Sequence, residues 1–449
     1  MNKGMNGKKL IVTLLLICAV ASVGVLVGRW TLQNVSAEVE GYEELKVFTE
    51  ALTLVRKQYV ENVEQKDLVY SAIKGMLNSL DPHSAFMSPD MYKEMQVDTK
   101  GEFGGLGIQI GIKDGMLTVI APLEDTPAFR AGIKAGDKIL KINDEPTKDM
   151  SLHDAVGKMR GIPSTSVKIT IVREGWKETK DFTIVREIIK IKSIKSKLLD
   201  DRIGYIKINQ FQEQTAEDLS HALETLEQEN MSSLILDMRN NPGGLLNSAV
   251  DISSFFLPAE KLIVYIEDRQ GKKIEYSSSG GEFDVEFPMI VLVNEGSASA
   301  SEIVAGALKD WNRAVIIGTP TFGKGSVQSV IPLSDGSALR LTTAKYYTPK
   351  GISIQTTGIE PDIVVKQILK EGEQGRPIIR EKDLQGHLEN GELILEEEES
   401  EMIPMKIDEE NDTQLQRAID LLKTWKVFKE IPKEVSTKTS DETEAVTTQ

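Results

Sequence analysis

A serine-rich helix start and a glycine-flanked lysine are the residues of this chain whose types and spacing could do chemistry. Residues 296–302 read GSASASE and follow Met289–Val293, an apolar run with the length of a buried strand. Residues 323–325 read GKG and follow a second apolar run over residues 314–318. A hydroxyl at a helix start and a lysine in a nearby loop could meet above one sheet edge. A nucleophile and its base need that geometry.

Each of these groups also has a purely structural explanation. Lys324 could act as a base only when neutral, so its pKa must fall well below about 10. The loop over residues 319–327 contains no acidic residue, which favours such a shift. An exposed turn lysine is the alternative for Lys324, and the spacing from Ser299 to Glu302 is that of a helix-capping box. Both alternatives stay open at the level of these residues.

Other kinds of chemistry have weaker support. The four histidines, His83, His153, His221 and His387, show no metal-ligand spacing, so we expect no metal and no cofactor. Residues 318–324 nearly match a phosphate-binding loop, but the next position lacks the hydroxyl that would bind magnesium, which argues against a nucleotide-dependent enzyme. The net charge is −16, and most of it lies in residues 381–449, which argues against nucleic acid as a partner.

The N-terminal residues predict targeting to a membrane. Residues 10–28 carry no charge and follow three lysines, as in a membrane anchor with its N-terminus inside the cell. A cleavable signal peptide is the alternative, because residues 35–37 resemble a small-residue cleavage site. In both cases we expect the rest of the chain to work outside the cytoplasm, anchored or secreted.

The surrounding pattern predicts the elements that must position the serine and the lysine. Residues 203–245 read as strand, helix and strand, and this alternation continues through the serine region, which is typical of an α/β core. After Gly325 the pattern changes to β-hairpins. Residues 41–80 have the periodicity of two amphipathic helices, which could pack on a second subunit or on their own core. From Val365 the chain is charged and poor in core residues, and we expect the end after Pro432 to be disordered.

Residues 101–188 resemble a PDZ domain. The pattern PAxxAGIxxGDxILxIN over residues 127–143 carries the resemblance. It implies a site that binds a peptide C-terminus by adding a strand to a sheet edge, faced by a helix over residues 152–159. A simple tight bend is the alternative for the glycine-rich turn. The implied peptide-binding residues are Gly105, Leu106, Gly107, Ile108 and Ile110.

Five motifs together resemble the carboxyl-terminal processing proteases, serine peptidases related to the tail-specific protease. The motifs are residues 80–84 (LDPHS), 237–244 (DMRNNPGG), 296–302 (GSASASE), 321–328 (TFGKGSVQ) and 358–362 (GIEPD). With the PDZ-like module they cover roughly residues 40–390. The resemblance implies an α/β multidomain fold, with a ClpP- or crotonase-like peptidase core and an inserted PDZ domain.

The resemblance also implies roles for individual residues. Ser299 would be the nucleophile, Lys324 the general base and Gln328 the group that orients the lysine. The N–H groups of Ala300 and Gly243 would form the oxyanion hole, with Gly244 as the alternative to Gly243. Arg160, at the end of the PDZ-like helix, is a candidate gating residue.

The implied activity is cleavage of extracytoplasmic proteins near their C-termini, with the PDZ domain binding the substrate and gating the enzyme. Expected partners are therefore proteins or peptides with free C-termini, the membrane, and a second copy of the chain. A catalytically inactive PDZ scaffold is the alternative. The expected division is 1–37 signal or anchor, 38–95 helical region, 96–188 PDZ domain, 189–366 peptidase core and 367–449 acidic C-terminal region.

Overall fold

The computed structural model describes residues 43–281, 287–368, 375–389, 402–404 and 411–430. The chain divides into two compact units, residues 1–76 and 77–449. In the first unit residues 43–58 are helical, and α2 (Gln65–Asn78) crosses the boundary between the units. Within the described ranges no helix has both the length and the apolar character needed to cross a membrane. The predicted anchor or signal lies outside the described residues.

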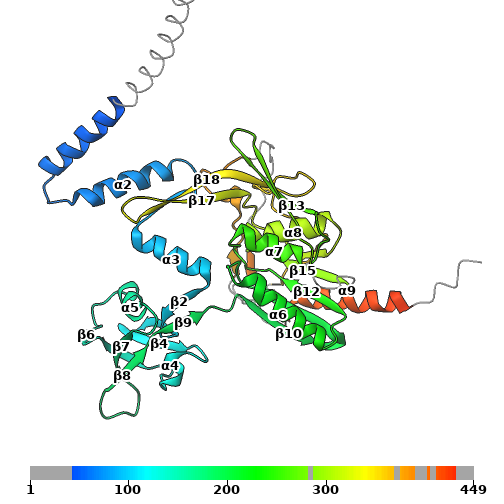
Figure 1. The fold of residues 1–449 in the computed structure, drawn as a ribbon, viewed down its shortest axis with the longest axis horizontal. Helices are drawn as coiled ribbons and strands as arrows, with labels where there is room; N and C mark the ends of the chain where they lie inside the picture. The colour runs from blue at the N-terminus through cyan, green and yellow to red at the C-terminus, as the bar shows by residue number, and fades with distance from the viewer. Residues whose placement is uncertain (1–42, 282–286, 369–374, 390–401, 405–410, 431–449) are drawn as a thin grey trace, which may run out of the picture. The chain divides into compact units, whose positions relative to one another are not determined.

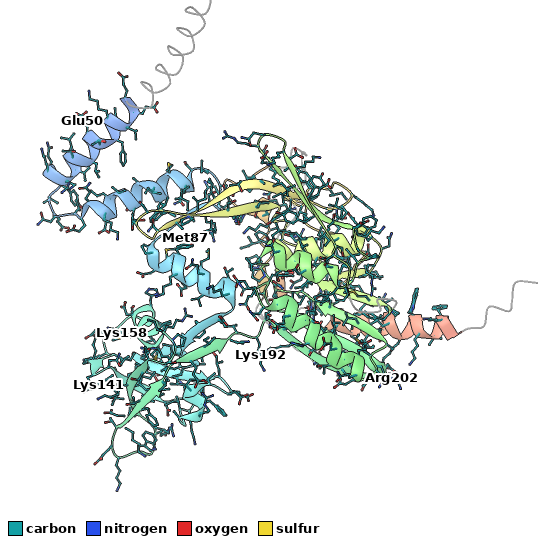
Figure 2. All side chains as sticks on the ribbon, in the orientation of Figure 1. Glu50, Met87, Lys141, Lys158, Lys192 and Arg202 are labelled. Atoms are coloured by element: carbon teal, nitrogen blue, oxygen red, sulfur yellow. The ribbon has the colours of Figure 1, made fainter. Side chains whose placement is uncertain are left out.

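A six-stranded sheet in the second unit supports the serine and lysine regions (Figure 1). Its spatial order is β10, β11, β12, β15, β16 and β19, and all neighbouring pairs are parallel except β10–β11. The strands are β10 (Ile194–Leu199), β11 (Ile203–Ile208), β12 (Ser233–Asp237), β15 (Met289–Val293), β16 (Val315–Gly318) and β19 (Ile363–Val364), with η1 (Asp200–Arg202) joining the first two. Arg202, labelled in Figure 2, lies at the turn between β10 and β11.

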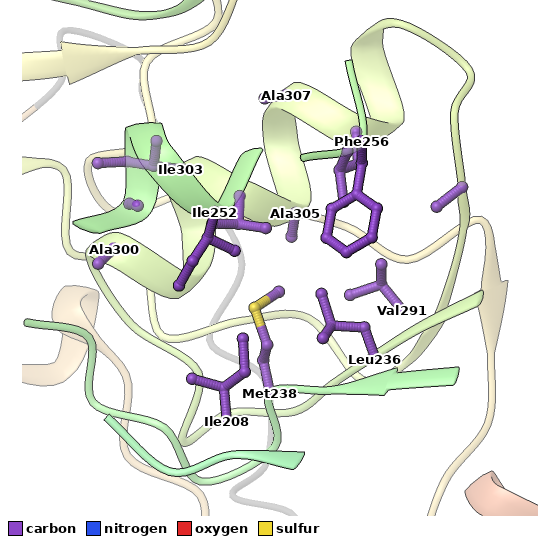
Figure 3. Close-up of a cluster of buried hydrophobic side chains, with 14 of the residues drawn as sticks. Ile208, Leu236, Met238, Ile252, Phe256, Val291, Ala300, Ile303, Ala305 and Ala307 are labelled. Atoms are coloured by element: carbon purple, nitrogen blue, oxygen red, sulfur yellow. The ribbon is translucent and has the colours of Figure 1, made fainter. Parts of the chain in front are cut away.

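Helices cover both faces of this sheet because its strands are apolar on both sides. Leu234 and Leu236 join a core with α6 (Thr215–Gln228), α7 (Leu246–Ser254) and α8 (Ala300–Asp310). Ile235, between them in the strand, joins a second core with α9 (Thr413–Glu430). Figure 3 shows α8 side chains such as Ala305 in the first core, on the side of strand residues such as Leu236 and Val291. Ala300, at the start of α8, is also buried in this core. The start of α8 is therefore fixed to the sheet by packing.

A second sheet is antiparallel and carries the continuation of the lysine loop. Its order is β1 (Ala85–Met87), β18 (Ala338–Tyr347), β13 (Leu262–Asp268) and β14 (Lys273–Ser277), and β17 (Ser326–Pro332) also pairs with β18. The register of β17 shifts between Val327 and Gln328, which marks a β-bulge. The bulge interrupts the alternation of side chains along this strand.

The PDZ-like module has its own sheet and core. The sheet order is β3 (Ile108–Lys113), β4 (Met116–Pro122), β5 (Lys138–Ile142), β7 (Ser166–Val172) and β8 (Lys180–Val185), with β6 (Glu145–Pro146) on β5. The module's helices are α4 (Pro127–Arg130) and α5 (Leu152–Met159), and its ends meet in the pair β2 (Glu102–Gly105) and β9 (Glu187–Lys190). The helix α3 (Pro89–Lys100) precedes β2, and Lys192 lies in the short connection from β9 to β10 (Figure 2). An inserted PDZ domain in an α/β multidomain fold is confirmed.

The C-terminal region contributes more to the core than its sequence indicated. Ala418 and Leu422 of α9 are buried against the sheet, and Arg239 forms a buried ion pair with Asp412. The pair β20 (Gly375–Pro377) and β21 (Met402–Pro404) and the turn η2 (Glu381–Asp383) also belong to this region. The residues of α9 that pack here include Leu415, Ala418, Ile419 and Leu422, which recur at helical spacing, so composition alone underestimates their packing. Residues after Pro432 lie outside the described residues.

Candidate active site

The three loops that carry the predicted catalytic groups leave the sheet at the same edge. β12, β15 and β16 are parallel, so the loops after Asp237, Val293 and Gly318 all begin at the carboxyl ends of their strands. Ligands of open α/β sheets bind outside these ends. Hydrogen bonds tie the loops together: the Ala298 N–H donates to the Asn241 carbonyl at 3.0 Å, and the Phe322 N–H donates to the Ser297 carbonyl at 3.0 Å.

Ser299 sits at the start of α8 in an unusual backbone conformation. Its φ is 54° and its ψ is −111°, which a non-glycine residue adopts only when surrounding contacts hold it there. The Ser299 carbonyl accepts from the N–H groups of Glu302 and Ile303, at 2.8 and 3.0 Å. Its side chain is half-buried and forms a hydrogen bond with the Tyr346 hydroxyl. The residue is therefore held by the first turn of the helix that follows it.

Glu302 connects the serine to the lysine loop. The carboxylate has no exposed surface, and its Oε2 accepts from the Ser299 N–H at 2.7 Å and from the Lys324 N–H at 3.0 Å. Its Oε1 accepts from the Thr321 hydroxyl at 2.5 Å and from the Gly323 N–H at 2.7 Å. Burial raises the pKa of Glu302 to about 7, while these four hydrogen bonds act in the opposite direction. One carboxylate thus fixes the backbones of both Ser299 and Lys324.

The part that Glu302 plays was missed in the sequence analysis. The capping-box spacing from Ser299 identified the contact within the helix, but not the contacts with residues 321–324. The signal was present as a glutamate in the first turn of an otherwise apolar helix, since a buried carboxylate needs several donors.

Lys324 lies in an environment that disfavours its charged form. Burial is the main cause that lowers its pKa, and the positive charge of Arg340 acts in the same direction. Glu381, Glu302 and Asp81 act in the opposite direction. Among the described residues no ion pair or hydrogen bond is recorded for the Lys324 side chain. The sequence around Lys324 has no acidic residue, but the tertiary structure brings three nearby.

The structure places Gln328 on β17, immediately after its β-bulge. The Gln328 Nε2 donates to the Ser326 hydroxyl at 2.9 Å, and this is its recorded side-chain hydrogen bond. The predicted regular strand would have put residues 324 and 328 on one face. Because the bulge breaks that alternation, spacing does not decide whether the Gln328 side chain reaches Lys324, and its orienting role stays a prediction.

Tyr346 is a neighbour of the site that the sequence analysis did not identify. Its N–H donates to the Gly325 carbonyl at 2.7 Å, and its hydroxyl meets the Ser299 side chain. Burial raises the pKa of Tyr346 to about 12, so the hydroxyl keeps its proton at neutral pH. Tyr346 comes from the hairpin that follows the lysine, and only strand pairing brings it to the serine.

The two predicted oxyanion donors differ in their surroundings. The Ala300 N–H, at the first turn of α8, has no recorded partner in the described part of the chain. The Gly243 N–H donates to the Asn241 side chain at 2.9 Å and is therefore occupied in this conformation. Gly243 has φ 96°, and a Cβ there would lie 2.9 Å from the Ser299 Cβ and 2.9 Å from the Ala300 nitrogen. Only glycine allows this close approach, and the choice between Gly243 and Gly244 stays a prediction.

The predicted peptide-binding residues lie together at one edge of the PDZ-like sheet. β3, which contains Ile108 and Ile110, pairs with β4 alone and packs against α5. The carbonyls of Leu106 and Gly107 accept from Ala128 and Leu123, whereas no partner is recorded for their N–H groups within the described ranges. Gly105, the last residue of β2, pairs with Glu187. The arrangement can accept an added strand and a carboxylate.

Arg160 ends α5 and faces the start of the module. Its guanidinium lies 4.5 Å from the centre of the Phe103 ring. Its charge also acts on Asp98 of α3, where burial and Glu94 raise the pKa and Arg160 lowers it.

Comparisons with known proteins match three regions of the chain. Residues 202–365 match Peptidase family S41, residues 118–173 match a PDZ domain, and residues 28–91 match the activating protease CtpB N-terminal domain. Over 391 residues the chain is 43% identical to a carboxy-terminal-processing protease of Bartonella bacilliformis, covering 86% of this chain and 90% of that one. It is 37% identical to carboxy-terminal processing protease CtpB of Bacillus subtilis, covering 74% and 70%.

Among solved structures, a photosystem II D1 C-terminal processing protease is 31% identical to this chain, with a TM-score of 0.42. The match covers 71% of this chain and 92% of that protein's chain. The fold, the three matched regions and the identity over nearly the whole length of the Bartonella relative lead to one assignment. The chain belongs to the carboxy-terminal processing protease family and is a serine-type peptidase with a PDZ domain.

Proposed function

We propose that this chain is an endopeptidase with a Ser299–Lys324 catalytic dyad, and that it cleaves extracytoplasmic proteins near their C-termini. The observation that carries the proposal is the shared contact on Glu302, whose Oε2 accepts from the N–H groups of both residues. A nucleophile and a base must be held in one geometry before the substrate arrives. A single buried carboxylate that binds both backbones supports that arrangement.

The lysine environment supports its role as the base. Burial lowers the pKa of Lys324, so a larger fraction of its amine is neutral near physiological pH than in water. The neutral Nζ takes the proton of the Ser299 hydroxyl as Oγ forms a bond to the substrate carbonyl carbon. The same proton then passes to the leaving amine as the peptide bond breaks. Water hydrolyses the resulting ester and restores Ser299.

The carbonyl oxygen becomes negatively charged in this reaction and requires donors. The Ala300 N–H lies at the positive end of α8 and has no partner among the described residues, which supports its assignment to the oxyanion hole. The second donor comes from the backbone at Gly243 or Gly244. For Gly243 to serve, its N–H must leave Asn241, which suggests a resting and an active arrangement of this loop.

The PDZ domain is proposed to bind the substrate C-terminus. Within the part of the chain that the structure describes, the N–H groups of Leu106 and Gly107 have no partner, which supports a carboxylate site, and the outer edge of β3 is unpaired, which supports strand addition. A substrate held there by its tail presents an upstream peptide bond to Ser299.

Gating by the PDZ domain is supported by a series of contacts that leads towards the oxyanion loop. Arg160 acts on Asp98 of α3, and the Asp98 carbonyl accepts from the Gln212 side chain at 3.2 Å. The next residue back, Phe211, donates its N–H to the Gly243 carbonyl at 3.0 Å. Movement of α3 on peptide binding would therefore act on the peptide group between Gly243 and Gly244, which carries the alternative donor, the Gly244 N–H, and adjoins the Gly243 N–H.

Membrane attachment and dimer formation complete the proposal. The lysine-flanked apolar residues 10–28 support an extracytoplasmic location, with a membrane anchor or a cleaved signal. Leu45, Phe48 and Leu54 in the N-terminal helix are exposed, which supports its contact with a second copy.

Hydrolysis of an unstructured protein by the wild type, Ser299→Ala and Lys324→Ala tests the dyad. Both variants should lose on the order of 10⁴-fold or more in kcat, as for residues that act as one catalytic unit. Thermal unfolding of each variant controls for loss of structure. Wild-type rates in folded Lys324→Ala would exclude this residue as the base.

A further inference from the structure

A buried histidine–glutamate pair lies beside the Lys324 loop and takes no part in the proposed reaction. His83 Nε2 lies 2.9 Å from Oε1 and 2.7 Å from Oε2 of Glu381. Glu381 has no exposed surface, and the His83 side chain is 13% exposed. Since a carboxylate can only accept, Nε2 carries the proton. The two residues are 298 positions apart, so only the tertiary structure creates this pair.

Glu381 holds the backbone on both sides of Lys324. Its N–H donates to the carbonyl of Phe322 at 3.0 Å. Its Oε1 accepts from the Gln355 Nε2 at 2.9 Å, and the Gln355 Oε1 in turn accepts from the Gly325 N–H at 3.0 Å. The loop is thus held directly at Phe322 and through one amide at Gly325.

His83 is itself fixed, so it can orient Glu381. The His83 N–H donates to Asp81 at 2.8 Å, and the His83 carbonyl accepts from the Arg340 Nε at 3.0 Å. Asp81 also accepts from the N–H and hydroxyl of Ser84. The motif at residues 80–84 is therefore held on β18 by Arg340 and Thr342, and its histidine side chain contacts Glu381.

We propose that Glu381 and His83 are positioning residues for the catalytic base, Glu381 anchoring the Lys324 loop and His83 fixing the Glu381 carboxylate. This rests on the proposed role of Lys324. It assigns a function to the turn η2 (Glu381–Asp383) of the C-terminal region, whose first residue supports the Lys324 loop. It also gives the motif at residues 80–84 a mechanical role.

Electrostatics provides a readout that a purely structural role would not move. Four charged groups from four elements act on Lys324: Arg340 from β18, Glu302 from α8, Glu381 from η2, and Asp81 before β1. Loss of the Glu381 charge should lower the pKa of Lys324 further, because Glu381 acts to raise it. The acid limb of the pH–rate profile should then move to lower pH.

The test measures kcat, KM and pH profiles of the full-length chain on an unstructured protein with a free C-terminus. Glu381→Gln should lower kcat by about 10²-fold, as expected for a misplaced catalytic group, with KM changed less than about threefold. Its acid limb should move to lower pH. His83→Gln should lower kcat by a smaller factor, because Glu381 keeps its contacts with the loop. His387→Gln is the matched control, since the His387 Nδ1 lies 2.9 Å from the Leu384 carbonyl of its own turn.

Two results for a folded Glu381→Gln variant would overturn the inference. One is a wild-type kcat, and the other is a reduced kcat with the acid limb of its pH–rate profile unchanged. Lys324→Ala is measured in the same experiment. If it is inactive, the Ser299–Lys324 dyad still stands and only the role of Glu381 is rejected. If it is fully active, the proposed function is rejected as well. Gln355→Met decides the matter if Glu381→Gln does not fold. It removes the amide link to Gly325 and keeps side-chain volume, so wild-type kcat in this variant would also overturn the inference.

Discussion

Two backbone edges of this molecule meet their proposed ligands in opposite ways. At the carboxyl edge of the core sheet most polar groups already have partners: Glu302 accepts four donors, and the Gly243 N–H is taken by Asn241. At the outer edge of the PDZ-like sheet, the N–H groups of Leu106 and Gly107 have no recorded partner among the described residues, and β3 pairs on one side.

The difference follows from what each edge does. Catalysis is fastest when donors and charges are fixed before the reaction, so the core edge uses its polar groups to hold one another. Binding by strand addition needs backbone groups that are still free, so the PDZ edge must remain unsatisfied until a peptide arrives. Changes at the core edge should therefore reduce kcat, and changes at the PDZ edge should mainly alter KM and peptide dependence.

The largest effect among the variants that sharpen this comparison is expected for Glu302→Gln. In this variant an amide NH2 group replaces one carboxylate oxygen. The amide nitrogen cannot accept a hydrogen bond, so the N–H groups of Ser299 and Lys324 lose their common acceptor. We expect kcat at pH 8 to fall by about 10²- to 10³-fold. Glu295→Gln is the matched control, because Glu295 is a buried glutamate of the same connection, and its Oε2 accepts from the Thr319 hydroxyl at 3.3 Å. Equal kcat in both variants would contradict the role of Glu302.

The PDZ edge is tested by the substrate's own C-terminus. Amidation removes the carboxylate that the N–H groups of residues 106 and 107 are proposed to bind. A charge-assisted hydrogen bond contributes about 1.5–3 kcal/mol, so kcat/KM should fall by about tenfold or more, mainly through KM. Rates are compared for one peptide with free and amidated ends. Equal KM values for the two peptides would show that the PDZ edge does not bind the carboxylate, and the contrast between the two edges would no longer hold.

Arg340→Gln tests the charge balance at Lys324. Burial and the Arg340 charge both lower the pKa of Lys324, so loss of that charge should raise it. A smaller fraction of the lysine is then neutral at pH 7, and the acid limb of the kcat profile should move to higher pH. Arg340→Lys keeps the charge and should keep the wild-type profile. A profile that moves equally in both variants would point to lost packing instead.

Arg160→Ala should have the smallest effect, because it acts through Phe103 and Asp98 and not at the reacting atoms. We compare the hydrolysis rate of a substrate with a free C-terminal carboxylate to that of the same substrate with an amidated end. The ratio of the two rates should change by about two- to fivefold, which corresponds to the free energy of an exposed cation–π contact. Activity and peptide dependence that both match the wild type would remove Arg160 from the gating proposal.

Local patterns in the sequence were sufficient for most elements near the site. Met289–Val293 was predicted as a strand from its continuous apolar run, and β15 has these bounds. The helix Leu152–Met159 was predicted from the PDZ resemblance, and α5 has these bounds. The C-terminal helix α9 was not predicted, because its burial depends on a sheet face formed by residues far away in the chain.

By itself the sequence determined which groups could react: a hydroxyl before an apolar helix, a lysine between glycines, and a PDZ-like turn. Tertiary structure alone decided how those groups are held and charged. Glu302 reaches Lys324, Glu381 reaches the same loop, and Gln328 donates to Ser326. The reason is physical: hydrogen bonds and charges act through space, and the partners that position Lys324 approach it only after the strands have paired.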